Sequence, residues 1–404
     1  KQQDGLRYHA RDVAMVRAKN INIPIVLGTA TPSLESWHNA TRIDFKYNFL
    51  KLTQRAVKDA QLPEVRTVLV DDKTKHGISR LLVDSINERL ERKEQSLIFI
   101  NRRGYAPVLF CSLCSWTSEC KKCSTKLVVH RKTNRLKCHH CGHDQKMISQ
   151  CPSCDNLNLR PLGLGTQKIE EVLNSFFPKA TILRVDRDTT RSKKSLSLLY
   201  ERMNNRDIDI LVGTQMLAKG HDFPFLTLVG VIDTDNALYS PDFRAPEKLF
   251  SQLMQVSGRS GRSNIKGEVL IQTAFPNNPV FDGLKKHDYA IFARSLLNER
   301  KQMNLPPFGF TAILRVEAKY LKYAERFINS AAKHAESLSN SVIVYDPVRP
   351  SIEKLKGFER FQLFVQADAR ADLQKLLRKW VIYLREYPLA NRVKWSLDVD
   401  PIEF

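Results

Sequence analysis

The chain has 404 residues, enough for two to four domains. Its 64 lysines and arginines outnumber 43 aspartates and glutamates, which gives a net charge of +21 and a pI of about 9.7. This excess favours a polyanionic partner such as nucleic acid over a merely solvated basic surface, because no basic tail accounts for it. No apolar run approaches the ~18 residues of a membrane span, which argues against a membrane protein.

All eight cysteines fall between Cys111 and Cys154. Such clustering, in a chain without a secretory signal pattern, favours metal ligands in a reducing compartment over disulfides, so we expect a cytosolic protein. The chain begins with Lys1 rather than methionine, and we expect it to be a fragment or a processed piece of a longer protein.

The first predicted elements are a helix and a strand. Tyr8-His9-Ala10-Arg11-Asp12 is typical of a loop that enters a helix capped near Asp12. Ile23–Leu27 predicts an apolar strand, which leads into Gly28-Thr29-Ala30-Thr31-Pro32-Ser33. The hydroxyl groups of this last segment suit contact with a phosphate, and equally the simpler role of a helix N-cap.

The next predicted elements are an amphipathic helix and a strand. The helix begins near residue 77, and the strand covers Ser96–Ile100. The strand leads into a loop at residues 101–105 that carries Arg102 and Arg103. These two arginines are either phosphate contacts or ordinary exposed side chains of a loop.

The cysteine block is the most specific signal in the chain. Two C-x2-C pairs together supply four thiolates to one Zn²⁺, with Zn–S distances of about 2.3 Å. Lys126–His130 and Asn134–Lys137 predict a hairpin that brings the two inner pairs together as a zinc ribbon. The four pairs are Cys111/Cys114, Cys120/Cys123, Cys138/Cys141 and Cys151/Cys154.

The spacing of the pairs predicts two zinc sites. Only five residues separate the first and second pairs, which leaves little room for a hairpin between them. We therefore assign the outer pairs, Cys111, Cys114, Cys151 and Cys154, to one Zn²⁺, and the inner pairs, Cys120, Cys123, Cys138 and Cys141, to the other. Full thiolate coordination indicates structural zinc. The alternatives are an iron–sulfur cluster, or a ligand among His130, His139, His140 and His143.

The part of the chain after the cysteines predicts a parallel sheet. A Gly/Thr loop at Leu162–Glu171 leads into an amphipathic helix, and a helix N-terminus near Thr166 suits a phosphate. Buried strands are expected at Thr181–Val185, Ile208–Gly213, Leu226–Ile232 and Gly267–Ala274.

Two polar segments accompany these strands. Thr214–Pro224 follows one strand, and a helix from near Ala245 leads into Gln255–Arg262. Arg259 and Arg262 stand among glycines and suit a phosphate, because glycine lets the backbone approach and guanidinium binds phosphate oxygens bidentately. A basic surface turn without a ligand is the alternative.

The end of the chain predicts a small α+β sandwich. A charged helix at 286–304 is followed by Leu305-Pro306-Pro307-Phe308-Gly309, the clearest boundary in the sequence. Lys354, Lys356 and Arg360 suit DNA contacts or a solvated face equally. The predicted strands are Ala312–Val316, 342–345, Phe361–Val365 and Val393–Asp398, and the predicted helices are 320–338 and 370–386.

Three of these segments resemble motifs of superfamily 2 helicases: Gly28–Ser33 resembles motif III, Thr214–Asp222 motif V, and Gln255–Arg262 motif VI. The resemblance implies a nucleotide site made by Gln255, Arg259 and Arg262, with Arg262 as arginine finger, and by Gly220, Asp222 and Gly258. Ser257 and Ser260 stand where alanine is common in the family.

Tyr8–Asp12 and the double-zinc insertion resemble, more narrowly, the PriA family of bacterial replication-restart helicases, and the resemblance extends from Tyr8 to Asp400. In that family the loop at 8–12 follows the Mg²⁺-binding box and senses single-stranded DNA, and its ring and guanidinium groups suit an unpaired base. The DNA-binding residues so implied are Tyr8, His9, Arg11, Thr29, Thr31, Arg102, Arg103, Thr166, Thr214 and Lys219.

The expected fold is an α/β RecA-like helicase lobe with a parallel sheet. It carries an inserted double zinc-ribbon block, follows a remnant of a first RecA-like lobe, and precedes a small α+β domain. The expected domains are 1–75 for the end of lobe 1, 76–304 for lobe 2 with its zinc insertion at 108–160, and 305–404 for a domain that binds DNA or partners.

The resemblance implies the C-terminal part of an ATP- and Mg²⁺-dependent 3′→5′ DNA helicase that remodels stalled forks and starts primosome assembly. It implies forked and single-stranded DNA, single-strand-binding protein and primosome proteins as partners of a monomer in the bacterial cytoplasm, at forks of the nucleoid. The sequence contains no G-x-x-x-x-G-K-[ST] loop and no Asp-Glu box, so we expect this chain alone not to hydrolyse ATP.

Two alternatives stay open. One is a non-catalytic zinc-ribbon protein that binds nucleic acid on a degenerate helicase lobe. The set Gln255, Arg259 and Arg262 argues against it, because a pure binding module needs no γ-phosphate ligands. The other is a nuclease or translocase that uses the same motor.

Overall fold

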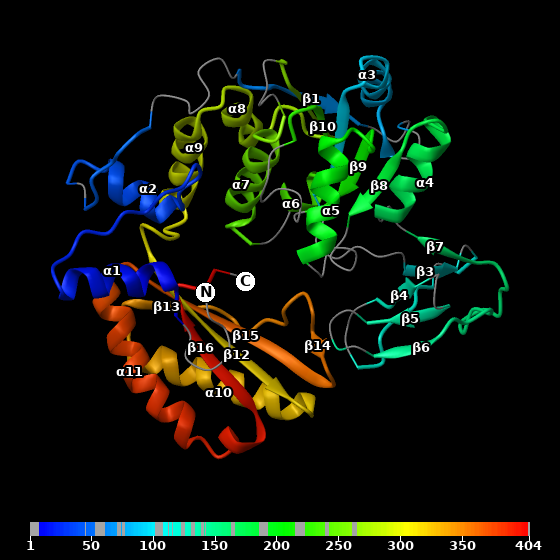
Figure 1. Ribbon diagram of the computed structural model, residues 1–404. Helices are drawn as coiled ribbons and strands as arrows, with labels where there is room; N and C mark the ends of the chain where they lie inside the picture. Colours follow the sequence, from blue (N-terminus) through cyan, green and yellow to red (C-terminus); the bar gives the residue numbers. More distant parts are fainter. Residues whose placement is uncertain are drawn as a thin grey trace. The chain divides into compact units, whose positions relative to one another are not determined.

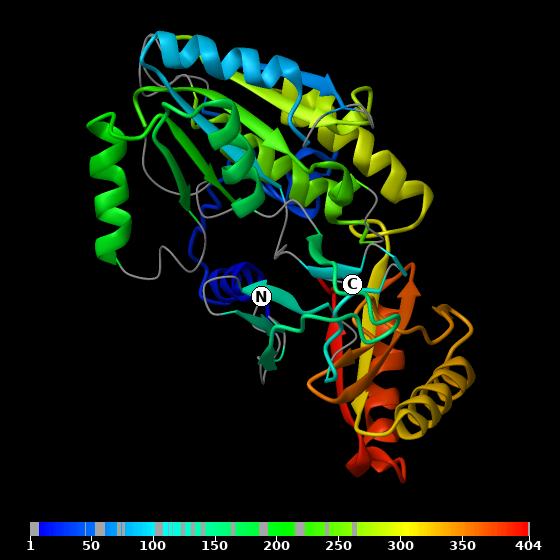
Figure 2. The same cartoon turned by 90° about the vertical axis from the view of Figure 1, so that its right-hand side faces the viewer.

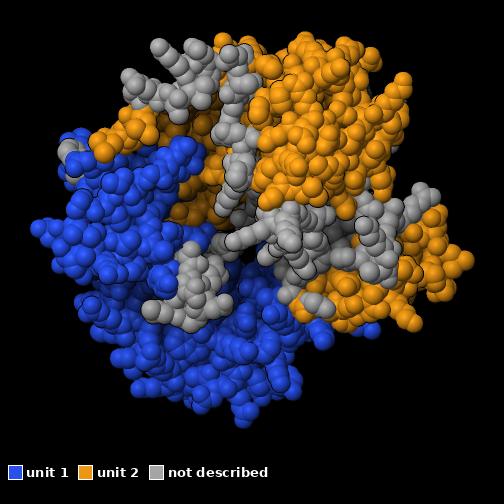
Figure 3. All heavy atoms as spheres, viewed as in Figure 1, with its two compact units in different colours: residues 1–48, 120–125, 296–404 blue, residues 49–119, 126–295 orange. Residues whose placement is uncertain are grey.

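The computed structural model divides the chain into two compact units (Figure 3). Unit 1 comprises residues 1–48, 120–125 and 296–404, and unit 2 comprises residues 49–119 and 126–295. The described residues are 8–44, 46–52, 61–70, 74, 77–101, 108–111, 113–114, 116–122, 126–130, 134–138, 141, 143–162, 166–185, 193–214, 223–238, 242–260 and 265–402.

Unit 2 contains a six-stranded parallel sheet with the order β1-β11-β10-β2-β9-β8 (Figure 1). Every residue of β2, β9 and β10 is buried. Parallel sheets are covered on both faces, which is why these strands appear as mostly apolar runs in the sequence. The strands are β1 (Glu64–Leu69), β2 (Gln95–Ile100), β8 (Ile182–Val185), β9 (Ile210–Gly213), β10 (Leu226–Ile232) and β11 (Glu268–Thr273).

Helices cover both faces of the parallel sheet. On one face, Leu82 and Ile86 of α3 and Leu173 of α4 share a core with Ile98 and Val212. Figure 1 shows α7 and α8 on the other side of the sheet. The expected α/β class is therefore confirmed. The helices of unit 2 are α3 (Arg80–Glu91), α4 (Thr166–Phe176), α5 (Lys193–Asn204), α6 (Asp235–Leu238), α7 (Ala245–Ser257) and α8 (Pro279–Lys285), and α9 (Tyr289–Gln302) leads into unit 1.

Strand β1 extends the sheet beyond the boundary that we expected. The sequence places residues up to 75 with a first lobe, whereas β1 pairs in parallel with β11, from Glu64 opposite Glu268 to Leu69 opposite Thr273. Residues 49–119, which include β1, belong to unit 2. The strand gives a weak sequence signal because it is a partly exposed edge strand with charged residues at Glu64 and Arg66.

A second, antiparallel sheet of five short strands carries the cysteines. Its order is β6-β5-β4-β3-β7. The expected hairpin is present as β4 and β5, in which His130 lies opposite Arg135. The strands are β3 (Val108–Cys111), β4 (Val128–His130), β5 (Arg135–Lys137), β6 (Asp144–Lys146) and β7 (Leu159–Leu162), so the ribbon lies in the connection from β2 to β8.

The C-terminal part of unit 1 is the expected α+β sandwich. The antiparallel sheet has the order β13-β15-β12-β16, with β14 beside β15, and Figure 2 shows both long helices on the same side of it. Trp380 of α11 is fully buried and donates a hydrogen bond from Nε1 to the Ala331 carbonyl of α10 (2.9 Å). The elements are β12 (Phe310–Ala318), α10 (Leu321–Leu338), β13 (Val342–Val344), β14 (Lys354–Leu355), β15 (Phe358–Ala367), α11 (Arg370–Glu386) and β16 (Lys394–Val399).

The N-terminal part of unit 1 contains two helices, α1 (Ala10–Asn20) and α2 (Leu34–Thr41). The cap expected near Asp12 is wrong: His9 is the N-cap of α1, and Asp12 lies in the first helical turn. The strand expected at Ile23–Leu27 is also wrong. This run has no regular structure and its side chains are exposed, Val26 by 82%, because no strand among the described residues lies beside it to pair with its backbone.

Among the residues that the structure describes, no helix combines the length and the apolar character that a membrane crossing demands.

The loop between α9 and β12 depends on a glycine. A Cβ added at Gly309 would lie 2.0 Å from the carbonyl oxygen of Asn304, a backbone atom that cannot move aside cheaply. Glycine at position 309 is therefore required on steric grounds, in addition to being part of the turn signal at residues 305–309.

We predict that Gly309→Ala lowers the free energy of unfolding by about 1–3 kcal/mol, the usual cost of overpacking. Gly28→Ala is the matched control, because an added Cβ there meets nothing within 4 Å. Thermal unfolding followed by circular dichroism measures both. Equal melting temperatures for the two variants would contradict the prediction.

Candidate metal centre and phosphate-binding residues

The pairing of β3 with β7 brings the outer cysteine pairs together. Cys111 ends β3 and lies opposite Leu159 of β7, while Cys151 and Cys154 precede β7 in the chain. The Sγ atoms of Cys111, Cys114, Cys151 and Cys154 all lie within 4.8 Å of one another. Cys111 and Cys151 are buried, and Cys114 is exposed. The structure thus groups the four cysteines that the sequence assigns to one site.

Hydrogen-bond donors surround the sulfur atoms of this group. Asn156 donates from Nδ2 to Cys111 Sγ (3.4 Å), and the backbone amide of Ser153 donates to Cys151 Sγ (3.4 Å). The amide of Lys122 donates to Cys120 Sγ in the same way (3.4 Å). In both C-x2-C pairs the amide two residues after the first cysteine therefore points at its sulfur. Such bonds stabilise thiolates and orient metal ligands.

The thiols of the group differ in their readiness to ionise. Burial disfavours the Cys111 thiolate, but hydrogen bonds from the backbone of Cys114 and from Asn156 outweigh it and lower the pKa of Cys111 to about 6. The backbone of Asn156 favours the Cys154 thiolate, but thiol contacts with Cys114 and burial outweigh that and raise the pKa of Cys154 to about 12. Without a metal, the thiolate form of Cys111 is favoured and that of Cys154 is disfavoured. A divalent cation would stabilise several thiolates at once.

The dimensions of the group fit zinc. Sγ of Cys111 lies 3.6 Å from Sγ of Cys154, and Sγ of Cys114 lies 3.6 Å from Sγ of Cys151. A tetrahedron with Zn–S bonds of about 2.3 Å has S···S edges of about 3.8 Å. A bound Zn²⁺ would cross-link the strand ends. With four thiolates it would have no open position for a substrate.

A second group contains Cys120, Cys138 and Cys141, whose Sγ atoms also lie within 4.8 Å of one another. Cys123, expected as its fourth member, lies outside the described residues, as do His139 and His140, and the side chain of His130 is likewise not described. His143 belongs to neither group.

Three of the residues expected to face a nucleotide, Gln255, Gly258 and Arg259, lie at or just beyond the end of α7. Gln255 is exposed and donates from Nε2 to Ser251 Oγ (3.5 Å), and Arg259 is only 7% exposed. Gly258 has φ −66°, a value open to any residue, and a Cβ there would approach nothing closer than 3.4 Å. Its backbone therefore does not require glycine. Gly220, Asp222 and Arg262 lie outside the described residues.

Two serines flank Gly258 and Arg259 and differ in their hydrogen bonding. Both are buried. Ser260 donates from Oγ to the Thr227 carbonyl (3.4 Å), whereas Ser257 Oγ has no hydrogen-bond partner among the described residues. A buried hydroxyl without a partner costs free energy, so the interior at residue 257 suits a methyl group better than a hydroxyl.

The residues expected to contact DNA are only partly described. Tyr8 is exposed, Thr214 is half-buried directly after β9, and the amide of Thr31 donates to Thr29 Oγ1 (3.1 Å). Thr166 begins α4 without a described side chain, and Arg102, Arg103 and Lys219 lie outside the described residues.

Arg11 has protein partners that the sequence did not indicate. Its Nη1 donates to Ser33 Oγ (2.6 Å) and Ser36 Oγ (3.2 Å), and its Nε donates to Asp12 Oδ1 (2.8 Å). Ser33 is the N-cap of α2 and accepts from the Ser36 amide (3.3 Å), the simpler role left open by the sequence. His9, two residues before Arg11 in the sequence, is half-buried.

The sequence did not indicate the contacts of three further residues: Asn156, Glu35 and Arg300. Asn156 carries a signal in retrospect, because it follows a C-x2-C turn by two residues. Glu35 and Arg300 carry none, because their contact joins positions 265 residues apart.

Comparisons with known proteins match the chain at both the family and the whole-chain level. A model of the PriA DNA helicase Cys-rich region (CRR) domain matches residues 120–146, and one of the Primosomal protein N C-terminal domain matches residues 301–402. Replication restart protein PriA of Haemophilus influenzae is 40% identical over 402 residues, which cover 99% of this chain and 54% of that protein. The namesakes from Rickettsia prowazekii (38%) and Bacillus subtilis (35%) match 100% and 99% of the chain, and 62% and 50% of their own lengths.

The chain resembles solved structures only distantly. Saccharomyces cerevisiae Dbp5 bound to RNA and ADP BeF3 is 12% identical, with a TM-score of 0.29 over 73% of this chain and 46% of that chain. The DUF1998 helicase MrfA bound to DNA is 13% identical, with a TM-score of 0.28 over 57% of this chain and 23% of that chain. Likeness at this level carries no argument about function.

We predict two zinc ions per chain and one in Cys151→Ser, because loss of a buried ligand empties the outer-pair site alone. Gln150→Ser introduces the same side chain at the exposed neighbouring position; it is the control and should keep both ions. Elemental mass spectrometry of the purified protein after gel filtration measures the content. Iron in place of zinc, or unchanged zinc in Cys151→Ser, would refute the assignment.

We further predict that Ser257→Ala is neutral or raises the free energy of unfolding by up to about 1 kcal/mol, because it removes a buried hydroxyl without a partner. Ser260→Ala should lower it by about 0.5–1.5 kcal/mol, because it removes a hydrogen bond. Urea unfolding at neutral pH measures both variants. Destabilisation of Ser257→Ala beyond that of Ser260→Ala would be the opposite of the expected order.

Proposed function

The chain belongs to the PriA family of replication restart proteins, and we propose that it forms part of an ATP-dependent 3′→5′ DNA helicase. The intact protein would recognise and remodel stalled replication forks and begin primosome assembly. The chain spans 50–62% of the length of the curated relatives named above. Those relatives are 35–40% identical along essentially the whole chain.

One observation carries the proposal: a cysteine ribbon lies in the connection from β2 to β8 of a parallel sheet, in a chain similar to replication restart proteins from end to end. Either feature alone is common. Zinc ribbons occur in many proteins, and parallel sheets with covering helices host many activities. The ribbon itself matches the PriA DNA helicase Cys-rich region (CRR) domain at residues 120–146, and the similarity to replication restart proteins covers the rest of the chain.

The proposed nucleotide site uses Gln255, Arg259 and Arg262, with Gly220, Asp222 and Gly258 beside them. An arginine at the γ-phosphate stabilises the charge of the transition state, which is worth roughly 10³–10⁵ in rate. ATP with Mg²⁺ would be the cofactor of the intact enzyme. The P-loop and the Mg²⁺-binding carboxylates would come from outside the present sequence, which contains neither motif.

The proposed DNA contacts are Tyr8, His9, Thr29, Thr31, Thr214 and Lys219, with Arg102, Arg103 and Thr166 toward the phosphates. The net charge of +21 supports a DNA partner, because it attracts a polyanion from every direction. Arg11 would act differently from its first assignment. Its guanidinium already donates to Ser33, Ser36 and Asp12, so it would hold the Thr29–Ser33 segment rather than a base.

The two proposed zinc sites would be structural. Zn²⁺ held by the outer pairs would fix the ends of β3 and β7, and Zn²⁺ held by the inner pairs would close the β4–β5 hairpin. The ribbon would then serve as a rigid wedge at a fork and a docking surface for primosome proteins. Together with single-strand-binding protein, these would be the partners of a monomer acting at forks in the bacterial cytoplasm.

DNA-stimulated ATP hydrolysis tests the proposal. We expect no activity from the 404-residue chain, and strong stimulation by forked or single-stranded DNA in a longer form that carries the P-loop and the Mg²⁺-binding box. Arg262→Ala in that form should lower the stimulated rate by 10³-fold or more, about 4 kcal/mol of transition-state stabilisation. Arg294→Ala, an exposed position on α9, is the control and should match the parent.

A longer form that binds forks without hydrolysing ATP would favour the alternative, a zinc-ribbon protein that binds nucleic acid on a degenerate lobe. A stimulated rate that Arg262→Ala leaves intact would remove Arg262 from the proposed finger role.

A further inference from the structure

Helix α2 begins at a cluster of polar contacts. Arg11 donates from Nη1 to Ser33 Oγ (2.6 Å) and Ser36 Oγ (3.2 Å), and these two hydroxyls lie 3.1 Å apart. Ser33 also caps the helix through the Ser36 amide. The start of α2, and with it the end of the Thr29–Ser33 segment, is thereby fixed to α1.

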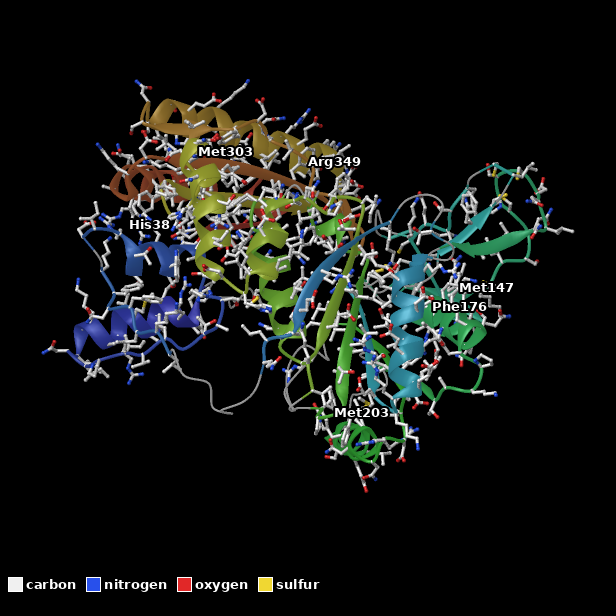
Figure 4. All side chains as sticks on the ribbon, turned by 90° about the horizontal axis from the view of Figure 1, so that it is seen from above. His38, Met147, Phe176, Met203, Met303 and Arg349 are labelled. Carbon is white, nitrogen blue, oxygen red and sulfur yellow. The ribbon has the colours of Figure 1, made fainter. Side chains whose placement is uncertain are left out.

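An arginine of α9 contacts the same helical turn. Arg300 is 1% exposed, and its Nη1 donates to the Glu35 carboxylate (3.5 Å) and to the Pro306 carbonyl (3.1 Å). One turn later, the His38 ring of α2, labelled in Figure 4, packs edge-on against Phe308 with ring centroids 4.9 Å apart. Helix α2 therefore rests on the loop that follows α9.

That loop is in turn fixed to the C-terminal sheet. Gln366 of β15 is buried and donates from Nε2 to the Asn304 carbonyl (2.6 Å). The side chain of Asn304 donates to the Asp368 carboxylate. The contacts form an unbroken series from the Thr29–Ser33 segment through α2 and the loop at 304–309 to β15, all within unit 1.

We propose that Arg300 is a positioning residue: through Glu35 it ties the Thr29–Ser33 segment to the C-terminal α+β domain, so that the segment and the domain move as one body. The tie itself concerns this chain alone. Its consequence for DNA-stimulated ATP turnover rests on the proposed function, in which Thr29 and Thr31 contact DNA.

Burial makes this contact sensitive to substitution. A guanidinium enclosed by protein must find acceptors, and here the Glu35 carboxylate supplies the opposite charge while the Pro306 carbonyl supplies a second acceptor. Glutamine at position 300 is neutral and shorter, so it cannot span both acceptors. Glutamine at position 35 keeps the shape of glutamate and removes only the charge.

Hydrogen–deuterium exchange of the 404-residue chain tests the tie. In Arg300→Gln and in Glu35→Gln, amides of α2 should exchange at least tenfold faster than in the parent, and the double variant should exchange no faster than Arg300→Gln. Amides of β10 and β11 report on the other unit and should be unchanged. Arg294→Gln replaces an exposed arginine of the same helix and is the matched control.

Equal exchange of α2 in the Glu35→Gln, Arg300→Gln and Arg294→Gln variants would overturn the tie. Glu35 is partly exposed, so we expect Glu35→Gln to fold. It therefore tests the contact even if Arg300→Gln fails to fold.

A second readout separates positioning from simple stabilisation. In the longer form, Glu35→Gln should lower the DNA-stimulated kcat at least fivefold, while the KM for ATP and the rate without DNA stay within twofold. If the DNA-stimulated rate and the rate without DNA fell together, in proportion to the folded fraction, Arg300 and Glu35 would only stabilise the fold. That result would overturn the positioning role. If DNA did not stimulate ATP hydrolysis by the longer parent form, the proposed function would be refuted. The hydrogen–deuterium exchange experiment would still test the contact between Arg300 and Glu35.

Discussion

The parallel pairing of β2, β9 and β10 is the constraint on which the rest of unit 2 depends. Parallel neighbours cannot be joined by tight turns, so each connection must cross a face of the sheet and return. The crossings supply the helices that bury both faces, and they leave the polar loops at the carboxyl ends of the strands. Thr214 after β9 stands at such an end. The cysteine ribbon lengthens one of these connections and leaves the sheet order intact.

The pattern of the sequence predicted the elements whose burial is uniform. The expected strand Leu226–Ile232 is β10 residue for residue, because a short and mostly apolar run between Pro224 and Asp233 favours a buried strand in an α/β chain. Helix α11 was expected with its observed bounds because its apolar residues recur every three or four positions, with charged residues between them. The grouping of Cys111 and Cys114 with Cys151 and Cys154 followed from spacing alone.

The features that the sequence did not predict correctly all depend on contacts between distant parts of the chain. Ile23–Leu27 has the composition of a strand, but a strand exists only beside a partner, and none is among the described residues. Strand β1 was overlooked because an edge position leaves half of its side chains exposed. The contact of Arg300 with Glu35 brings together residues far apart in the chain, and local pattern holds no information about such pairs.

Equilibrium binding tests most directly the proposal that this chain belongs to a motor that acts on branched DNA. Affinity of the 404-residue chain for a three-way fork and for a blunt duplex of equal charge would be measured by fluorescence anisotropy over a range of salt. We expect tighter binding of the fork at every salt concentration, and a steep linear fall of log K against log salt because of the net positive charge. Equal affinity for both DNAs, or affinity indifferent to salt, would contradict it.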